Sequence, residues 1–207
     1  MTKQYAFYFD ANLCIDCKAC QIACQDTHNL PGWSLWRRVF EYSGGTWVPQ
    51  DNVLVPSSIY TYAVSISCMH CQEPICTEVC PTGAMHKRED GIVLIDESRC
   101  VGCRYCQWSC PYGAPVYRED LGVMTKCTFC ENLLAQGQNP ACVDACVMRA
   151  LDYGELDELR SKYGDLAETA PLPTADITQP AFVVTPNRLG QPSVGGTGRV
   201  IDLKEEF

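Results

Sequence analysis

The stretch "CVGCRYCQWSCP", residues 100–111, decides the fold, because it places four cysteines at the spacing C-x2-C-x2-C-x3-C before a proline. Cys100, Cys103 and Cys106 lie in one compact loop, which can offer three thiolates to one metal centre. Four residues of helix rise roughly 6 Å, so Cys106 and Cys110 share a helix face but lie too far apart for one set of ligands. The stretch therefore predicts a short helix whose cysteines belong to two neighbouring metal centres.

The same pattern recurs along the sequence, because its sixteen cysteines fall into four blocks of four. In every block the last two cysteines are four positions apart, and small flanking residues recur at fixed distances: Ala84, Ala114 and Ala150 each follow the last cysteine of their block by four. Such regular spacing indicates a duplicated structural unit. Block one contains Cys14, Cys17, Cys20 and Cys24; block two Cys68, Cys71, Cys76 and Cys80; block three Cys100, Cys103, Cys106 and Cys110; and block four Cys127, Cys130, Cys142 and Cys146.

The spacing favours iron and sulfur over zinc or disulfides. C-x2-C-x2-C-x3-C-P is the ligand run of bacterial ferredoxins, in which the fourth cysteine binds the neighbouring cluster. Zinc sites use pairs of CxxC knuckles, and disulfides need an oxidising compartment. The opening "MTKQYAFYFDANLC" has no apolar signal segment. We therefore expect four 4Fe–4S clusters, each bound by four thiolates.

Other polar residues near the blocks are expected to play lesser roles. Sixteen thiolates complete four clusters, so His28, His70 and His86 are predicted to be structural residues or hydrogen-bond donors. Positive charge beside a cluster raises its reduction potential. For the three basic residues beside the blocks, we favour a role in balancing the negative charge of a cluster over a role in raising its reduction potential. These residues are Lys18, Arg104 and Lys126.

Charge and hydropathy exclude two classes of partner. The formal net charge is −9, so the sequence has no basic excess with which to neutralise nucleic-acid phosphates. No apolar run approaches the roughly 20 residues that span a bilayer. We expect no direct membrane span, and any membrane association would pass through a partner.

The residues between the blocks predict an α+β protein of short helices and small β hairpins. "AMHKREDGIVLID" indicates a hairpin with strands near 84–88 and 92–96, turning at Asp90 and Gly91. "YAFYFD" and "ALDYG" indicate further strands that could pair with each other. "WSLWRRVFEYSGGTWV" indicates two strands joined through Gly44 and Gly45, with packing roles for its tryptophans, which are Trp33, Trp36 and Trp47.

The last fifty residues differ in character from the rest. "ELDELRSKYGDL" is typical of a short helix, and the sequence after it is rich in proline, glycine and threonine. This tail has too few apolar residues for a core of its own. We expect it to be extended, and its run "AFVV" favours docking on a partner.

The residues favour one pairing of the blocks without excluding another. Blocks two and three flank the predicted hairpin, which favours one module made of both, inserted between blocks one and four. The residues do not exclude block one with two and three with four. Nested pairing predicts a first ferredoxin-like module at 1–24 and 127–154, an inserted strand region at 25–60, a second module at 61–126, and a helix with a partner-docking tail at 155–207.

The order of the blocks, the extended block four and "PTGAMHKREDGIV…CVGCRYC…CPYGAP" resemble the four-cluster iron–sulfur subunits that accompany molybdopterin oxidoreductases. The stretch "APLP" and the tail after it are most similar to the subunits of the anaerobic dimethyl sulfoxide reductases. In this family the nested pairing is found, so the resemblance implies four ligand sets. Site 1 would comprise Cys14, Cys17, Cys20 and Cys146; site 2 Cys24, Cys127, Cys130 and Cys142; site 3 Cys68, Cys71, Cys76 and Cys110; and site 4 Cys80, Cys100, Cys103 and Cys106.

The resemblance also implies a function. Related nitrate reductase subunits have tryptophan at the position of Cys103 and hold a 3Fe–4S cluster there, so the cysteine implies 4Fe–4S. The protein would be a non-catalytic subunit in anaerobic respiration. It would pass electrons from a quinol-oxidising integral membrane anchor to a molybdopterin catalytic subunit that reduces dimethyl sulfoxide and related S- or N-oxides, in a heterotrimer.

This assembly would hold the protein at the inner membrane through the anchor. Co-export with the catalytic subunit favours the periplasmic side, and the cytoplasmic side is the alternative. Other possible functions are the equivalent subunit of a formate dehydrogenase or of a polysulfide or tetrathionate reductase, and a free-standing polyferredoxin. Binding of zinc in place of clusters is the remaining alternative.

Overall fold

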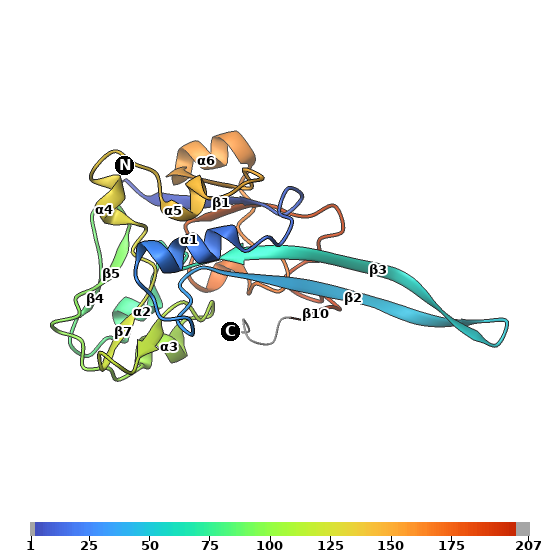
Figure 1. Cartoon of the computed structure of the whole chain (residues 1–207), viewed down its shortest axis with the longest axis horizontal. Helices are drawn as coiled ribbons and strands as arrows, with labels where there is room; N and C mark the ends of the chain where they lie inside the picture. Colours follow the sequence, from blue (N-terminus) through green and yellow to red (C-terminus); the bar gives the residue numbers. More distant parts are fainter. Residues whose placement is uncertain (1–2, 202–207) are drawn as a thin grey trace.

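The computed structural model describes residues 3–201 as small β-sheets and short helices, which confirms the α+β prediction (Figure 1). Residues 1–2 of the predicted first module and 202–207 of the predicted tail lie outside the described residues. In sequence order the elements are β1 (Tyr5–Asp10), α1 (Ala19–Thr27), β2 (Arg38–Gln50), β3 (Val53–Ile66), α2 (Ile75–Glu78), β4 (Met85–Lys87), β5 (Val93–Ile95), α3 (Tyr105–Ser109), β6 (Val116–Arg118), β7 (Val123–Thr125), α4 (Glu131–Leu134), α5 (Ala141–Asp144), β8 (Leu151–Glu155), α6 (Leu156–Tyr163), the 3-10 helix η1 (Ala175–Ile177), β9 (Phe182–Thr185) and β10 (Arg199–Val200).

A three-stranded sheet in the order β8-β1-β9 joins the first strand to two strands from the last third of the sequence. The central strand β1 pairs antiparallel with β8, as the sequence predicted, and parallel with β9. Phe7 and Phe9 face the main core, while Ala6 and Tyr8 pack with α6 on the other face. Because β1 is buried on both faces, its "YAFYFD" run is almost wholly aromatic or apolar.

The tail packs on the body of the same molecule, so the prediction that it docks on a partner is wrong for its apolar run. "AFVV" forms most of β9, and Phe182 and Val184 lie in the main core together with Leu172. The few apolar side chains of the tail pack into the core formed by the rest of the protein, so the tail needs no separate core. The prediction of a helix is confirmed by α6.

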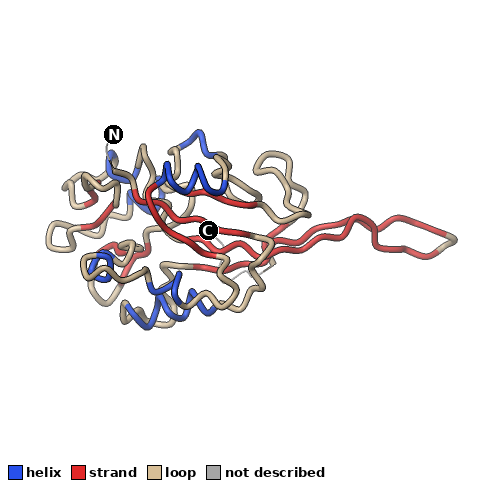
Figure 2. The backbone as a smooth tube through the Cα atoms, turned by 90° about the horizontal axis from the view of Figure 1, so that it is seen from above, coloured by secondary structure: helices blue, strands red, loops and turns tan. Residues whose placement is uncertain are grey.

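The strands β2 and β3 form one long hairpin that projects from the body, as Figures 1 and 2 show. The turn lies at Asp51 and Asn52, whose positive φ angles of 49° and 64° are those of a tight hairpin turn. The prediction of a turn at Gly44 and Gly45 is therefore wrong: the two glycines lie inside β2, where the register shifts at a bulge. Glycine allows a bulge as readily as a turn.

We call residues 44–59 the arm, since they form the projecting part of this hairpin (Figure 2). Packing roles are wrong for two of the three tryptophans. Trp36 is buried, but Trp33 is 56% exposed and Trp47, on the arm, is 67% exposed. Within residues 3–201, no helix is both long and apolar enough to cross a bilayer.

Two small hairpins and two helix pairs complete the body. The hairpin of β4 and β5 lies where the sequence predicted it, and β6 with β7 forms a second one between blocks three and four. The helix α1 packs against α5, and α2 packs against α3. The short helices predicted for the paired cysteines are thus present, and they lie together two by two.

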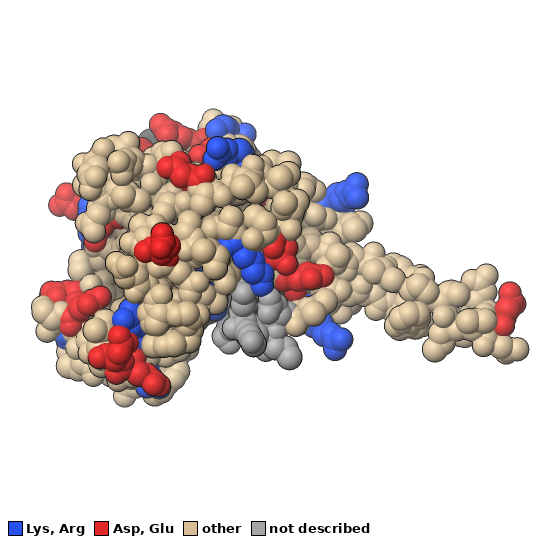
Figure 3. Space-filling model, viewed as in Figure 1, with Lys and Arg blue, Asp and Glu red and all other residues tan. Residues whose placement is uncertain are grey.

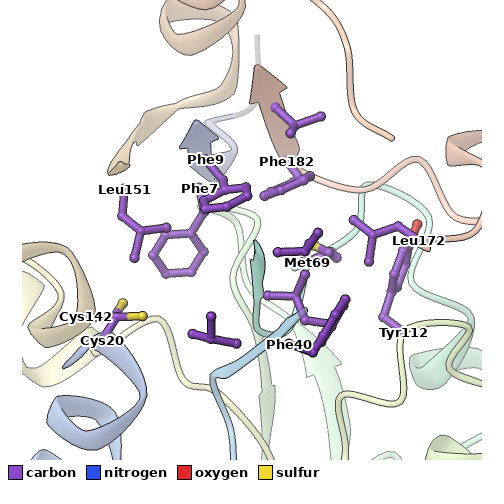
Figure 4. Close-up of a cluster of buried hydrophobic side chains, with 14 of the residues drawn as sticks. Phe7, Phe9, Cys20, Phe40, Met69, Tyr112, Cys142, Leu151, Leu172 and Phe182 are labelled. Atoms are coloured by element: carbon purple, nitrogen blue, oxygen red, sulfur yellow. The ribbon is translucent and has the colours of Figure 1, made fainter. Parts of the chain in front are cut away.

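The main core contains Phe40 of β2, whose side chain is fully buried near Met69, Tyr112 and Leu172 (Figure 4). We expect Phe40→Ala to destabilise the fold by about 3 to 5 kcal/mol, because the truncation leaves a cavity that the packed core cannot fill. The apparent Tm, followed by the loss of visible absorbance on heating, should fall by roughly 10 °C.

The control for this variant is Ile177→Ala, at a side chain that is 50% exposed, which should leave Tm nearly unchanged. Equal Tm values for the wild type and Phe40→Ala would show that this core does not hold the body together.

Candidate metal centres

All four cysteine blocks share one backbone feature. In each block the residue just before the second cysteine has a left-handed conformation: Asp16 (φ 57°), His70 (φ 43°), Gly102 (φ 65°) and Phe129 (φ 60°). This conformation costs a non-glycine residue roughly 1–2 kcal/mol. It turns successive N–H groups toward one side and so forms a concavity that favours anions. The repeat predicted from the cysteines therefore extends to the turn geometry of their loops.

The cysteine helices of blocks one and three begin with the same backbone turn. The helix α1 carries both Cys20 and Cys24 and begins after Lys18, which is left-handed at φ 56°. The helix α3 carries Cys106, is followed directly by Cys110, and begins after Arg104, which is left-handed at φ 64°. Blocks one and three thus use the same entry turn.

The thiols of site 1 line one cavity. Cys14, Cys17, Cys20 and Cys146 surround it together with apolar side chains that include Phe9. Cys17 is exposed, whereas Cys20 and Cys146 are buried. Burial, and then the charges of Cys20 and Cys146, raise the pKa of the Cys14 thiol to about 11. A neutral thiol is favoured there until a positive group is bound.

The thiols of site 4 line a second cavity. Cys80, Cys100, Cys103 and Cys106 surround it with apolar neighbours such as Met124. Burial, and then the charges of the three other thiols, raise the pKa of Cys106 to about 11. Burial also opposes ionisation of Cys80, but hydrogen bonds from the Met85 N–H and the Thr82 hydroxyl group outweigh it, so its pKa is lowered.

The thiols of site 2 lie near one another. Burial raises the pKa of Cys24, and the nearby charges of Cys127, Cys142 and Cys130 raise it further. His28 contacts this group, with its Nε2 atom 3.3 Å from the Sγ atom of Cys130. This contact agrees with the hydrogen-bonding role predicted for the histidines.

The thiols of site 3 also lie near one another. Burial raises the pKa of Cys76, as do the charges of Cys68, Cys110 and Cys71. The fully buried His70 lies directly before Cys71 and accepts a hydrogen bond from the Val93 N–H on its Nδ1 atom, over 3.0 Å. The thiols of sites 1 and 4 thus surround two cavities, and thiols of sites 2 and 3 lie near one another. The division of all sixteen thiols into four ligand sets stays a prediction.

The donor set fits an iron–sulfur cluster. Thiolates are the ligands that such clusters prefer, and the cavity linings of sites 1 and 4 contain no carboxylate or histidine side chain. Among residues 3–201, no three cysteine, histidine or acidic side chains converge closely enough to hold one metal ion. Four thiols spread around a cavity are what a cluster with several iron atoms requires.

Backbone N–H groups donate to thiol sulfurs in sites 1, 2 and 4. Such hydrogen bonds stabilise thiolates and raise the reduction potential of a bound cluster. The donors and acceptors are Ala150 N–H to Cys146 at 3.2 Å, Phe129 N–H to Cys127 at 3.4 Å, Met85 N–H to Cys80 at 3.4 Å and Met124 N–H to Cys100 at 3.4 Å.

Contacts between elements connect neighbouring groups of thiols in the order 1, 2, 3, 4, and we call the groups in this order the row. Sites 1 and 2 share the packed helices α1 and α5, and sites 3 and 4 share α2 and α3. The two pairs meet where Cys127 of site 2 lies close enough to Cys68 of site 3 for their charges to interact.

Three buried cations accompany the row of sites. Lys126, predicted from the sequence to compensate charge, donates to the carbonyl groups of Val93 and Cys127. Arg37 and Arg38 were missed by the sequence reasoning, and Arg38 donates to the Tyr112 carbonyl over 2.6 Å beside Cys110. Two adjacent arginines within the apolar run "LWRRVF" are the signal that could have found them, because buried arginines need buried partners.

The other two predicted cations differ from these. Arg104 is exposed and lies over the Tyr117 ring, 3.8 Å from its centroid. Lys18 lies beside the cavity of site 1. Both stand at the left-handed turn that opens a cysteine helix, so their backbone has a role as well as their charge.

Comparison with known proteins agrees with this architecture. The family model of the 4Fe-4S dicluster domain matches residues 59–156, which contain blocks two, three and four. The protein is 50% identical over 205 residues to the B subunit of anaerobic dimethyl sulfoxide reductase of Escherichia coli K12, covering 99% of this protein and 100% of that one. It is also 50% identical over 196 residues to the B subunit of the anaerobic dimethyl sulfoxide reductase of Haemophilus influenzae, covering 95% and 96%.

A more distant relative carries another substrate name. The B subunit of polysulfide reductase of Wolinella succinogenes is 35% identical over 194 residues, covering 92% of this protein and 98% of that one. The relatives with half of their residues identical to this protein carry the dimethyl sulfoxide reductase name, which confirms the resemblance drawn from the cysteine blocks and the tail. The protein belongs to the family of iron–sulfur B subunits of the anaerobic dimethyl sulfoxide reductases.

Proposed function

We propose that this protein is the electron-transfer subunit of an anaerobic reductase and carries four 4Fe–4S clusters, one at each of sites 1 to 4. The observation that supports this most directly is that the thiols of sites 1 and 4 surround two cavities, while thiols of sites 2 and 3 lie near one another. Each bound cluster would supply a one-electron redox centre. The protein itself contributes thiolates, N–H donors and burial, which fix the positions and the potentials of these centres.

The proposed partners are a molybdopterin catalytic subunit that reduces dimethyl sulfoxide and related S- or N-oxides, and a quinol-oxidising membrane anchor. The relatives in Escherichia coli and Haemophilus influenzae are named as one lettered subunit of a reductase, which implies enzymes of several subunits. A heterotrimer of these three subunits, with this protein in the middle and without catalytic residues of its own, agrees with a row of sites that has two ends.

Exposed apolar side chains at both ends of the row support two docking surfaces. Beside site 4, Tyr105 and Trp108 are 52% and 71% exposed, and their ring centroids lie 5.7 Å apart. Such amphipathic rings suit the interface between a membrane and water, so we assign this end to the anchor. Beside site 1, Ile15 and Val147 are exposed, and we assign that end to the catalytic subunit.

This assignment would hold the protein at the inner membrane through the anchor. We propose the periplasmic side, reached by export together with the catalytic subunit, and the cytoplasmic side is the alternative.

For the division into domains we retain the nested arrangement: a module at 1–24 and 127–154, a second at 61–126, an insertion at 25–60, and the terminal helix and tail from 155 to 207. The pairing of α1 with α5 and of α2 with α3 supports these two modules.

A related function on another sulfur substrate is the second candidate. A thiosulfate reductase electron transfer subunit of Salmonella typhi is 41% identical over 165 residues, and the Wolinella succinogenes relative is named for polysulfide. The same electron-transfer subunit would serve those reductases or a formate dehydrogenase, because the substrate binds to the catalytic subunit and not to this protein. A free-standing polyferredoxin would not need the exposed surfaces at the ends of the row.

Analysis of iron and acid-labile sulfide in the complex purified without oxygen tests the proposal. Four clusters of four iron and four sulfide atoms predict about sixteen of each per molecule. Visible absorbance and reduced-state EPR signals should accompany them. About eight of each, or colourless protein that contains zinc, would contradict the proposal. A fully loaded protein that is monomeric and stable alone would count against the assembly.

A further inference from the structure

Arg37 is a buried cation just before β2, and only 2% of it is exposed. Its Nη1 and Nη2 atoms donate to the hydroxyl oxygens of Ser65 and Ser67 over 3.1 and 3.0 Å. Its guanidinium lies over the Phe7 ring, with Cζ 4.8 Å from the ring centroid. Among residues 3–201, no carboxylate forms an ion pair with it. The position therefore holds a positive charge that the described acidic side chains do not neutralise.

The surroundings of Arg37 are thiols of two sites. Ser65, which binds its Nη1 atom, lines the cavity of site 1, and its hydroxyl oxygen lies 3.5 Å from the Sγ atom of Cys20. Burial by itself lowers the pKa of Arg37, but nearby thiolate charges, led by Cys142 and Cys20, outweigh it and raise this pKa. One of these thiols belongs to site 2 and the other to site 1, so the guanidinium lies between the two sites.

One N–H donor of the Arg37 guanidinium group has no acceptor within the described part of the protein. The Nε atom of Arg37 is buried and makes no hydrogen bond there. Leaving a charged donor unsatisfied in the interior costs free energy comparable to its desolvation. A negatively charged group bound at the neighbouring sites would remove this cost, since a cluster with four thiolates is an anion.

We propose that Arg37 sets the reduction potentials of the clusters at sites 1 and 2 and holds both above the values they would have without it. The inference rests on the proposed function. Reduction adds negative charge to a cluster, so a fixed positive charge nearby stabilises the reduced state more than the oxidised state. In the low dielectric of the interior this attraction is stronger than at the surface, and salt screens it much less.

The other two buried cations lie near a different site, so Arg37 is the one expected to change the potentials of sites 1 and 2. Arg38 lies beside Cys110, and the charge of Lys126 opposes the rise in the pKa of Cys76, so both act on site 3. Among the thiols, the leading electrostatic neighbours of Arg37 belong to sites 1 and 2, and towards site 3 it acts on His70, which is not a predicted ligand. Its removal should therefore change two potentials of the four and leave the others in place.

The test is an EPR-monitored redox titration of the complete, cluster-loaded complex carrying Arg37→Gln or Arg37→Met. Both variants remove the charge, and the methionine also avoids a buried polar group. We expect two of the four midpoint potentials to fall and the other two to keep their values. Arg37→Lys keeps the charge and should restore both potentials most of the way. Arg199→Gln, the same change at an exposed position on β10, is the matched control.

Each outcome decides between the possibilities. Unchanged potentials in both neutral variants, or an equal fall in Arg199→Gln, would overturn the inference. Loss of the clusters of sites 1 and 2 from both neutral variants would also overturn it, because Arg37 would then hold clusters in place instead of setting their potentials. Iron and sulfide analysis of the wild type separates this failure from that of the proposed function, which would show as missing clusters before any substitution.

Discussion

Replacing Cys103 with alanine is expected to convert the cluster of site 4 from 4Fe–4S to 3Fe–4S and to slow electron flow through that end of the row. Cys80, Cys100 and Cys106 would still hold three corners of the cube, but the fourth iron atom would lose its protein ligand and dissociate. A 3Fe–4S centre has a higher potential, and each 59 mV of increase holds the electron about tenfold more tightly. We therefore expect quinol-dependent turnover of the complex to fall at least about tenfold.

EPR spectroscopy of the oxidised complex measures this change directly, because an oxidised 3Fe–4S centre is paramagnetic whereas an oxidised 4Fe–4S centre is not. Iron content should fall by one atom per molecule, and reduction of the catalytic subunit by an artificial donor should persist if that donor bypasses site 4. Cys103→Ser is the matched control, since its oxygen can still bind iron. A Cys103→Ala complex with four unchanged 4Fe–4S signals would contradict the assignment of Cys103 to site 4.

A second large effect is expected at the arm: Trp47→Asp combined with Leu54→Asp should prevent binding of the catalytic subunit. Trp47, Pro49, Leu54 and Pro56 share one face of the hairpin, and Val48, Val53 and Val55 share the other. Asp51, at the tip, is the only charged residue of the arm (Figure 3). A hairpin that is apolar on both faces fits a protein groove that covers both, whereas a lipid surface would cover only one.

The position of the arm connects it to one end of the row. The strand β3 runs from the arm back to Ser65, which lines the cavity of site 1, the end that we assign to the catalytic subunit. An isolated two-stranded hairpin is at best marginally stable in water. Pro49 and Pro56 lack an N–H, which weakens pairing with another strand, so the contact should use side chains.

Co-purification measures the effect of the double variant. Truncating a buried tryptophan at an interface costs about 2 to 4 kcal/mol, and buried carboxylates add to this, so affinity should fall at least about 30-fold. Cluster content should stay at the wild-type value, because the arm lies away from the thiols. Leu166→Asp, at a side chain 44% exposed on the body, is the control. Recovery of the full complex with the arm variant would exclude the arm from the interface.

The local sequence predicted the elements that a few neighbouring residues define. The hairpin of β4 and β5 follows from Asp90 and Gly91 between two apolar runs, and β1 and β8 follow from their aromatic and apolar residues. The turn of the long hairpin was misplaced, because two glycines fit a bulge and a turn equally well. Only the register of β2 along β3, fixed by twelve paired positions, places the turn at Asp51 and Asn52.

The sequence by itself determined the cysteine blocks and their repeat, because a metal-binding loop imposes its spacing on neighbouring residues. The tertiary structure decided what depends on residues far apart in the sequence. It placed "AFVV" beside β1, where it completes a sheet and a core that the other segments leave unfinished. It also placed Arg37 between two groups of thiols, since a buried charge acquires its role only from the groups that folding brings around it.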